Sequence, residues 1–213
     1  MRENKMLQVH HLNNSRSQRI LWLLEELKAP YEIIYYKRDL ETNLAPEKLK
    51  EIHMLGKSPV ITDNGKVIIE SAAISTYIID QYAPSDFSPN KDDDDYYKYL
   101  ELMHYAEGSA MLPMLLLLYS SSLGKNAEPL MGRIFSEINL HVGYLSECLG
   151  ENDYFFRNKF SGLDTMISFV LEAAKISDSL KSFPNLINIL NKYQSRPAYK
   201  KALEKGGEYI LGS

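Results

Sequence analysis

The chain of 213 residues has little cysteine, no long apolar run and no excess of positive charge. Its single cysteine, Cys148, cannot form an internal disulfide, which fits a reducing compartment. The longest apolar run, Met111–Tyr119, is nine residues long, whereas a helix needs about 20 to cross a bilayer. We therefore expect a cytoplasmic protein without a transmembrane segment, and peripheral association with a membrane stays open.

The charge balance also excludes classes of partner. The net charge is −4, so the basic surface that nucleic acids select is missing, and we expect no nucleic-acid partner. The only acidic run is Asp92–Asp95. Four consecutive carboxylates on a helix point in different directions and make a poor metal cage. We interpret the run as a solvated helix start and expect no metal site.

The first part of the chain predicts an α/β arrangement. Met6–His11 and Tyr31–Lys37 have strand composition, and the segment between them has leucine and isoleucine at helical spacing. Two strands joined by a helix imply a parallel pair. Next, Val60–Asp63 and Lys66–Ile69 flank Asn64-Gly65, which favours a type I′ hairpin with positive φ at both turn residues. With a short helix or loop before this hairpin and a helix after it, the order β-α-β-α-β-β-α is thioredoxin-like.

Beyond this part the sequence predicts helices alone. Residues 84–91 contain prolines and serines and are expected to form a linker. The expected domains are therefore 1–83, thioredoxin-like, and 92–213, all-helical. A long helical segment is predicted from Asp92 to Ser122. A later one begins at Ser161, where Asp164 completes a capping-box pattern.

Five segments give the chain a resemblance to the glutathione S-transferases that extends over nearly its whole length. They are His10–Trp22 (HHLNNSRSQRILW), Met54–Val60 (MLGKSPV), Glu70-Ser71, Phe160–Asp164 (FSGLD) and Ser195–Tyr199 (SRPAY). Within the family, the first segment and Tyr35–Asp39 are most similar to the fungal, yeast-type transferases and to some bacterial homologues.

This resemblance implies an enzyme that uses glutathione as a co-substrate, needs no cofactor and acts in detoxification and the stress response. Such an enzyme stabilises the thiolate of glutathione for attack on small hydrophobic electrophiles, and in some cases also reduces organic hydroperoxides. The resemblance further implies a homodimer. Two other interpretations stay open: a transferase-fold binding or regulatory module without turnover, and a protein that stores apolar ligands.

The resemblance points to the turn before the first helix as the place where the thiol is activated. An unperturbed thiol has a pKa of about 8.5, so a hydrogen-bond donor at a helix N-terminus favours its ionised form. Counting back from Arg19 aligns the family's catalytic serine with Asn14, and Ser15 follows it. We expect Ser15 to activate the thiol, with Asn14 as the alternative. Both residues also suit a simple helix cap.

Two more groups of residues are implied. Glutathione would be held by Lys57, Ser58, Pro59, Glu70, Ser71 and His53. Within this set, Ser58 presents its backbone beside a cis-proline, while Glu70 and Ser71 hold the γ-glutamyl end. Lys57 or His53 would reach the glycyl carboxylate. The electrophile would contact His104, Tyr105, Ser109, Met111 and Leu112, in a pocket expected between the two domains.

Overall fold

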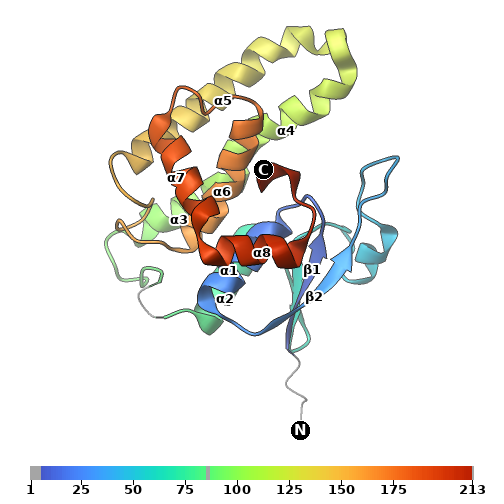
Figure 1. Cartoon of the computed structure of the whole chain (residues 1–213), viewed down its shortest axis with the longest axis vertical. Coiled ribbons are helices and arrows are strands. Elements are labelled where there is room, and N and C mark those ends of the chain that lie inside the picture. The colour runs from blue at the N-terminus through green and yellow to red at the C-terminus, as the bar shows by residue number, and fades with distance from the viewer. Residues whose placement is uncertain (1–5, 85–86, 213) are drawn as a thin grey trace. The chain divides into compact units, whose positions relative to one another are not determined.

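The computed structural model describes residues 6–84 and 87–212. Two compact units are present, one made of the residues up to 87 together with those from 194 onward, and the other of residues 88–193 (Figure 1). Residues 85 and 86 of the expected linker lie outside the described residues. The expected domain limits differ from this division in the assignment of the C-terminal segment, and they stay a prediction.

The first unit contains a four-stranded sheet in the order β2-β1-β3-β4. Its strands are β1 (Leu7–Leu12), β2 (Tyr31–Tyr36), β3 (Val60–Asp63) and β4 (Lys66–Ile69). β1 and β2 pair in parallel, and β3 runs antiparallel to both of its neighbours. Asn64 and Gly65 have φ values of 48° and 79°, so the predicted turn is confirmed. The sheet and its helices form the thioredoxin-like arrangement that the sequence predicted.

Two helices follow β1 and β4 in this unit, α1 (Ser17–Leu27) and α2 (Ser71–Tyr82). Ile20, Leu23 and Leu24 of the apolar stripe of α1 are fully buried, and Leu27 at its end is partly buried. A short 3₁₀ helix, Glu47–Glu51, supplies Leu49 to a separate apolar cluster with Leu12, Tyr36 and Val60. Since side chains alternate along a strand, neighbours on β1 face opposite sides of the sheet.

The last helix, α8 (Pro197–Gly206), lies alongside α1 in the same unit (Figure 1). The rings of Trp22 and Tyr199 meet edge to face with centroids 5.2 Å apart. Ion pairs from Glu25 to two lysines of α8 add to this contact. Packing of this kind depends on residues about 175 positions apart in the chain, which local periodicity does not reveal.

The second unit is helical throughout its described regular structure apart from one isolated β-bridge. Its helices are α3 (Tyr96–Tyr105), α4 (Met111–Ser120), α5 (Glu128–Leu149), α6 (Gly162–Ile176) and α7 (Pro184–Ser195), and the last two residues of α7 belong to the first unit. The helix predicted over 92–122 is interrupted, because residues 106–110 form a π-helical turn between α3 and α4. Such turns interrupt helices at single sites and have no periodicity signal.

The predicted capping box at the start of α6 is confirmed. Ser161 and Asp164 bond reciprocally, with the Ser161 N–H 2.8 Å from Asp164 Oδ2. Asp164 Oδ1 also accepts from the hydroxyl of Tyr193 at 2.6 Å. The carboxylate therefore ties the start of α6 to α7.

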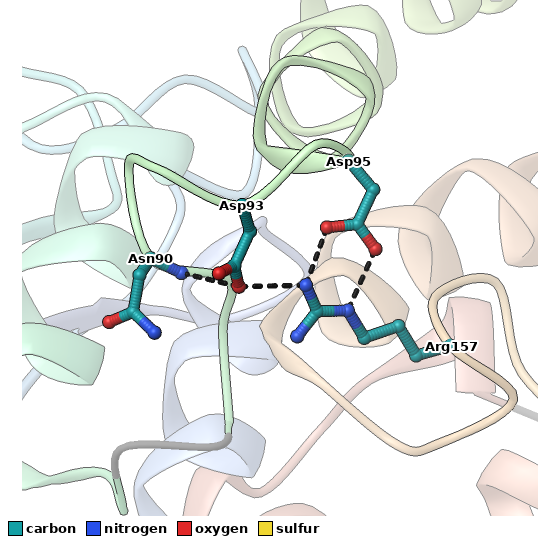
Figure 2. Close-up of polar contacts among 4 residues, drawn as sticks. All are labelled: Asn90, Asp93, Asp95 and Arg157. Carbon is teal, nitrogen blue, oxygen red and sulfur yellow. Dashed lines mark hydrogen bonds and ion pairs between the residues drawn. The ribbon is translucent and has the colours of Figure 1, made fainter.

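The acidic run before α3 is partly engaged in an ion-pair cluster. Figure 2 shows Arg157 between Asp93 and Asp95, with nitrogen–oxygen distances of 2.5–2.7 Å. Asp93 also accepts from the backbone N–H of Asn90 at 3.0 Å. Two of the four aspartates thus fasten the loop that precedes α6 to the start of α3, a role that the sequence did not suggest.

Candidate functional site

Strand register brings the predicted site segments to one end of the sheet. His10 of β1 pairs with Val60 of β3, and Val60 pairs with Ile69 of β4. Three segments therefore meet at the same end of the sheet: the chain after β1, the chain before β3 and the chain after β4. These are the segments that contain Ser15, Ser58 and Glu70-Ser71.

Ser15 lies in the turn that leads into α1, with 5% of its surface exposed. Its Oγ lies 2.8 Å from Ser17 Oγ and 3.4 Å from Ser58 Oγ. It also accepts a hydrogen bond from the Ser17 N–H at 3.2 Å. The hydroxyl thus caps the helix start, and it also contacts the loop that the resemblance assigns to glutathione.

Asn14 has a different environment. Its φ of 50° places it in the left-handed region, which asparagine tolerates better than most residues. Its Oδ1 accepts from the Ile210 N–H at 2.7 Å, and its carbonyl accepts from Arg38 Nη2 at 3.0 Å. Arg38 also donates from Nε to the carbonyl of Asn13 at 3.1 Å. Asn14 therefore shapes the turn, while its side-chain amide retains donor groups.

The loop before β3 contains the predicted cis peptide bond between Ser58 and Pro59. The Ser58 hydroxyl donates to the carbonyl of His10 at 3.1 Å, which fixes this loop against β1. Lys57 is exposed, and His53 is half-buried with its carbonyl accepting from the Gly56 N–H at 2.8 Å. No described contact joins Lys57 or His53 to Ser15.

Glu70 and Ser71 form the start of α2. Glu70 precedes the helix with a φ of 69°, and its carbonyl accepts the first helical bond, from Ile74. The Glu70 side chain is exposed, whereas Ser71 is buried. The first N–H groups of a helix have no intrahelical partner, so this position suits a carboxylate.

The five electrophile candidates lie in the second unit and do not share one environment. Met111 is 3% exposed and belongs to the core, whereas Leu112 is 55% exposed. His104 is exposed, and Ser109 lies in the π-helical turn. The hydroxyl of Tyr105 lies 2.6 Å from His141 Nδ1, and burial raises its pKa.

A cavity of about 410 Å³ is present at the turn between α4 and α5. Its lining residues are Leu117, Ser120, Ser121, Gly124, Lys125, Ala127, Glu128 and Met131. None of the electrophile candidates lines this cavity. Within residues 6–84 and 87–212, no helix is long and apolar enough to span a membrane, and no cluster of His, Cys, Asp and Glu could hold a metal ion.

Sequence reasoning missed two polar residues beside Ser15. Ser17 Oγ lies 2.8 Å from His11 Nδ1, and His11 Nε2 lies 3.0 Å from the carbonyl of Gly206. Burial lowers the pKa of His11, although the bond to Gly206 opposes this effect. Alternation along β1 could have placed His11 on the face toward α1, but no local pattern identifies Gly206 as its partner.

A sheet of this order with α1 and α2, followed by a helical unit, defines a thioredoxin-like protein with a C-terminal helical region. Residues 5–80 match the family model "Glutathione S-transferase, N-terminal domain". Glutathione S-transferase 3 of Schizosaccharomyces pombe is 35% identical, with 94% of this chain and 88% of that protein covered. Glutathione S-transferase 1 of Saccharomyces cerevisiae is 28% identical, with 94% and 95% covered.

A solved structure gives the same result in three dimensions. A glutathione S-transferase from Actinobacillus pleuropneumoniae superposes with a TM-score of 0.86 at 32% identity, covering 97% of this chain and 95% of that one. The chain belongs to the glutathione S-transferase family of enzymes, whose co-substrate is glutathione.

Proposed function

We propose that the chain binds glutathione at the end of its sheet and stabilises the thiolate for attack on small hydrophobic electrophiles. The observation that carries this proposal is the meeting of Ser15 with the Ser58-Pro59 loop, at 3.4 Å between the two hydroxyl oxygens. This meeting brings a hydroxyl at a helix N-terminus next to a backbone segment suited to a peptide ligand. Both the hydroxyl and the helix end favour a negatively charged sulfur.

The other predicted site residues at this end of the sheet have separate roles in the proposal. Ser71 and the N-terminus of α2 bind the carboxylate of the γ-glutamyl group, and Glu70 pairs with its ammonium. The backbone of Ser58 binds the cysteinyl unit. Lys57 or His53 binds the glycyl carboxylate. Asn14 remains the alternative to Ser15 as the donor to sulfur.

For the electrophile we propose the α3–α4 region with His104, Tyr105, Ser109, Met111 and Leu112. Exposed Leu112 is the strongest of these, since an apolar side chain open to solvent can contact a hydrophobic ligand directly. Reduction of organic hydroperoxides is proposed as a second activity, because a glutathione thiolate also attacks a peroxide oxygen. These reactions would serve detoxification and the stress response.

A steady-state assay tests the proposal. The purified protein is given glutathione with a panel of electrophiles and organic hydroperoxides, and turnover is expected with at least one electrophile. Glu70→Gln should raise the KM for glutathione, whereas Asp80→Asn, an exposed change on the same helix, should leave it unaltered. Binding of glutathione without turnover across the panel would favour a binding or regulatory module instead.

We also propose a homodimer in the cytoplasm, with peripheral membrane association left to test. Supporting the dimer, α4 and α5 expose large apolar side chains, among them Leu116, Leu118, Tyr119, Leu130 and Leu140. Packing of these side chains against a second copy would remove apolar surface from water. Light scattering should give twice the chain mass of 24.5 kDa, and a species of 24.5 kDa at micromolar concentration would contradict the dimer.

A further inference from the structure

Ser15 stands at the outer end of a chain of hydrogen bonds that runs into the first unit. Ser15 Oγ and Ser17 Oγ are 2.8 Å apart, and Ser17 Oγ and His11 Nδ1 are also 2.8 Å apart. His11 Nε2 then lies 3.0 Å from the carbonyl oxygen of Gly206, the last residue of α8. The exposed fractions of Ser15, Ser17 and His11 are 5%, 0% and 2%.

The partners determine the direction of each bond. A carbonyl oxygen only accepts, so His11 carries a hydrogen on Nε2 and donates it to Gly206. In a neutral imidazole Nδ1 is then an acceptor, and the hydroxyl of Ser17 donates to it at 2.8 Å rather than to the more distant carbonyl of Leu12 at 3.3 Å. The proton of Ser17 is thereby used, so the hydroxyl of Ser15 donates to Ser17. Ser58 Oγ is a second acceptor for this proton at 3.4 Å, but Ser17 Oγ is closer at 2.8 Å. In this arrangement the proton of Ser15 therefore points inward, away from a ligand at the end of the sheet.

This direction conflicts with a simple role of Ser15 as a donor to sulfur. One lone pair of Ser15 Oγ accepts from the Ser17 N–H, and the other is available to a ligand. In this arrangement the hydroxyl can accept a proton from a thiol, but it cannot donate one. Donation to sulfur requires every bond of the chain to reverse.

We propose that Ser15 and Ser17 relay the thiol proton of bound glutathione to Nδ1 of His11. This inference rests on the proposed function. The S–H bond breaks and its proton binds Ser15 Oγ, while the former Ser15 proton moves to Ser17 Oγ and the former Ser17 proton moves to Nδ1. The products are a thiolate and an imidazolium. Each bond now points outward, and Ser15 donates to the sulfur.

The position of Gly206 explains how a buried imidazolium is tolerated. Its carbonyl belongs to the C-terminal end of α8, where the helix dipole stabilises positive charge. A Cβ at this residue would lie 2.3 Å from Gln18 Oε1 and 3.1 Å from Leu21 Cδ1. A side chain at this position would therefore require the Gln18 and Leu21 side chains of α1 to move.

The other titratable groups around His11 come from the elements packed against β1. From β2, the ring of Tyr35 meets the imidazole edge-on with centroids 6.1 Å apart. From α1 and α8, Glu25 and Lys205 pair with each other. His10, the neighbour on β1, bonds instead to Tyr36 and to Thr62 on the opposite face. His11 therefore has no carboxylate partner among its described contacts, and the ligand thiolate supplies the counter-charge.

Heteronuclear NMR of the imidazole ring nitrogens tests the relay in the full-length protein. Added glutathione should protonate His11 Nδ1, with the signal assigned by its loss in His11→Gln. S-methylglutathione is the matched control, because it lacks the thiol proton and should leave the ring neutral. An ionised glutathione, seen by thiolate absorbance, beside a neutral His11 would overturn the relay. Failure of both ligands to bind would overturn the proposed function, and the relay with it.

Ser17→Ala provides a second test, because two explanations predict opposite results. If the relay operates, the pKa of bound glutathione rises by about one unit, a roughly tenfold loss of thiolate below that pKa. If Ser17 only competes for the proton of Ser15, that pKa falls and the relay is wrong. His10→Gln is the matched control for His11→Gln, since it removes the other buried histidine of β1 and should leave the thiol pKa unchanged.

Discussion

Two buried clusters of polar groups, one in each unit, differ in whether the direction of their hydrogen bonds is fixed. Around Asp164, the carboxylate accepts from the backbone and hydroxyl of Ser161, the backbone of Phe155 and the hydroxyl of Tyr193. Each of these donors points at the same acceptor, so the arrangement has a single direction. Around Ser15, the hydroxyls can donate either inward or outward.

This difference separates a stabilising cluster from a reactive one. A buried carboxylate that accepts hydrogen bonds from several donors stabilises the fold. Its removal costs much free energy, because those donors would be left unpaired. A chain of hydroxyls that ends at an imidazole can exchange one bonding pattern for another without moving heavy atoms. We expect substitutions in the first cluster to change stability and substitutions in the second to change catalysis.

The largest effect is expected for Asp164→Ala. The change leaves the buried hydroxyl of Tyr193 and the N–H of Ser161 without their acceptor, at about 1–3 kcal/mol for each. The free energy of unfolding should therefore fall by roughly 3–5 kcal/mol, measured by urea denaturation. Asp153→Ala, at an exposed aspartate that pairs with Lys192, is the control and should change little. Equal effects of the two changes would contradict the comparison.

The pH dependence of stability should also report on Asp164. Burial raises its pKa from 3.8 to about 6, more than its hydrogen bonds lower it. Between those values the folded chain holds a proton that the unfolded chain releases, so the free energy of unfolding falls as pH rises from about 4 to about 6. The change is up to about 3 kcal/mol. Urea denaturation at several pH values should show this slope, and Asp164→Asn should remove it.

Ser15→Ala should act on turnover and leave the fold intact. Loss of a charge-assisted hydrogen bond to sulfur, about 1.5–3 kcal/mol, raises the thiol pKa of bound glutathione by about one to two units. Glutathione affinity should change little, because the contacts of Glu70, Ser71 and Ser58 remain. The pH–rate profile and the dissociation constant measure the two effects separately.

Asn14→Ala is the companion variant, since it removes the amide donor without adding a charge beside the sulfur. If this change shifts the pH–rate profile while Ser15→Ala does not, Asn14 is the donor to sulfur and the assignment of Ser15 is wrong.

The smallest effect is expected for Arg157→Ala, at the exposed ion-pair cluster of Figure 2. Exposed ion pairs are weakened by competing water and salt, so stability should fall slightly, and less at high ionic strength. Thermal denaturation at two salt concentrations measures this difference. A loss of stability as large as that of Asp164→Ala would show that the exposed Arg157 cluster and the buried Asp164 cluster contribute equally.

Much of this protein follows from local sequence. The strand composition of β1 and β2, the helical spacing in α1, the Asn64-Gly65 turn and the Ser161–Asp164 capping box depend on residues a few positions apart, and the structure confirms each element. The resemblance assigned Ser15 and Ser58 to one site, and their hydroxyl oxygens lie 3.4 Å apart, while their roles stay a prediction.

Only the tertiary structure decided the rest. The contact of α8 with α1, the clamp of Arg38 on the turn at Asn14 and the carbonyl of Gly206 against His11 join segments 24 to 195 residues apart. The direction of the hydroxyl protons beside Ser15 depends on that last contact, since the carbonyl determines which imidazole nitrogen carries hydrogen. Periodicity and propensity depend on residues close together in the sequence, whereas the direction of these protons depends on packing between the N-terminal and C-terminal parts of the protein.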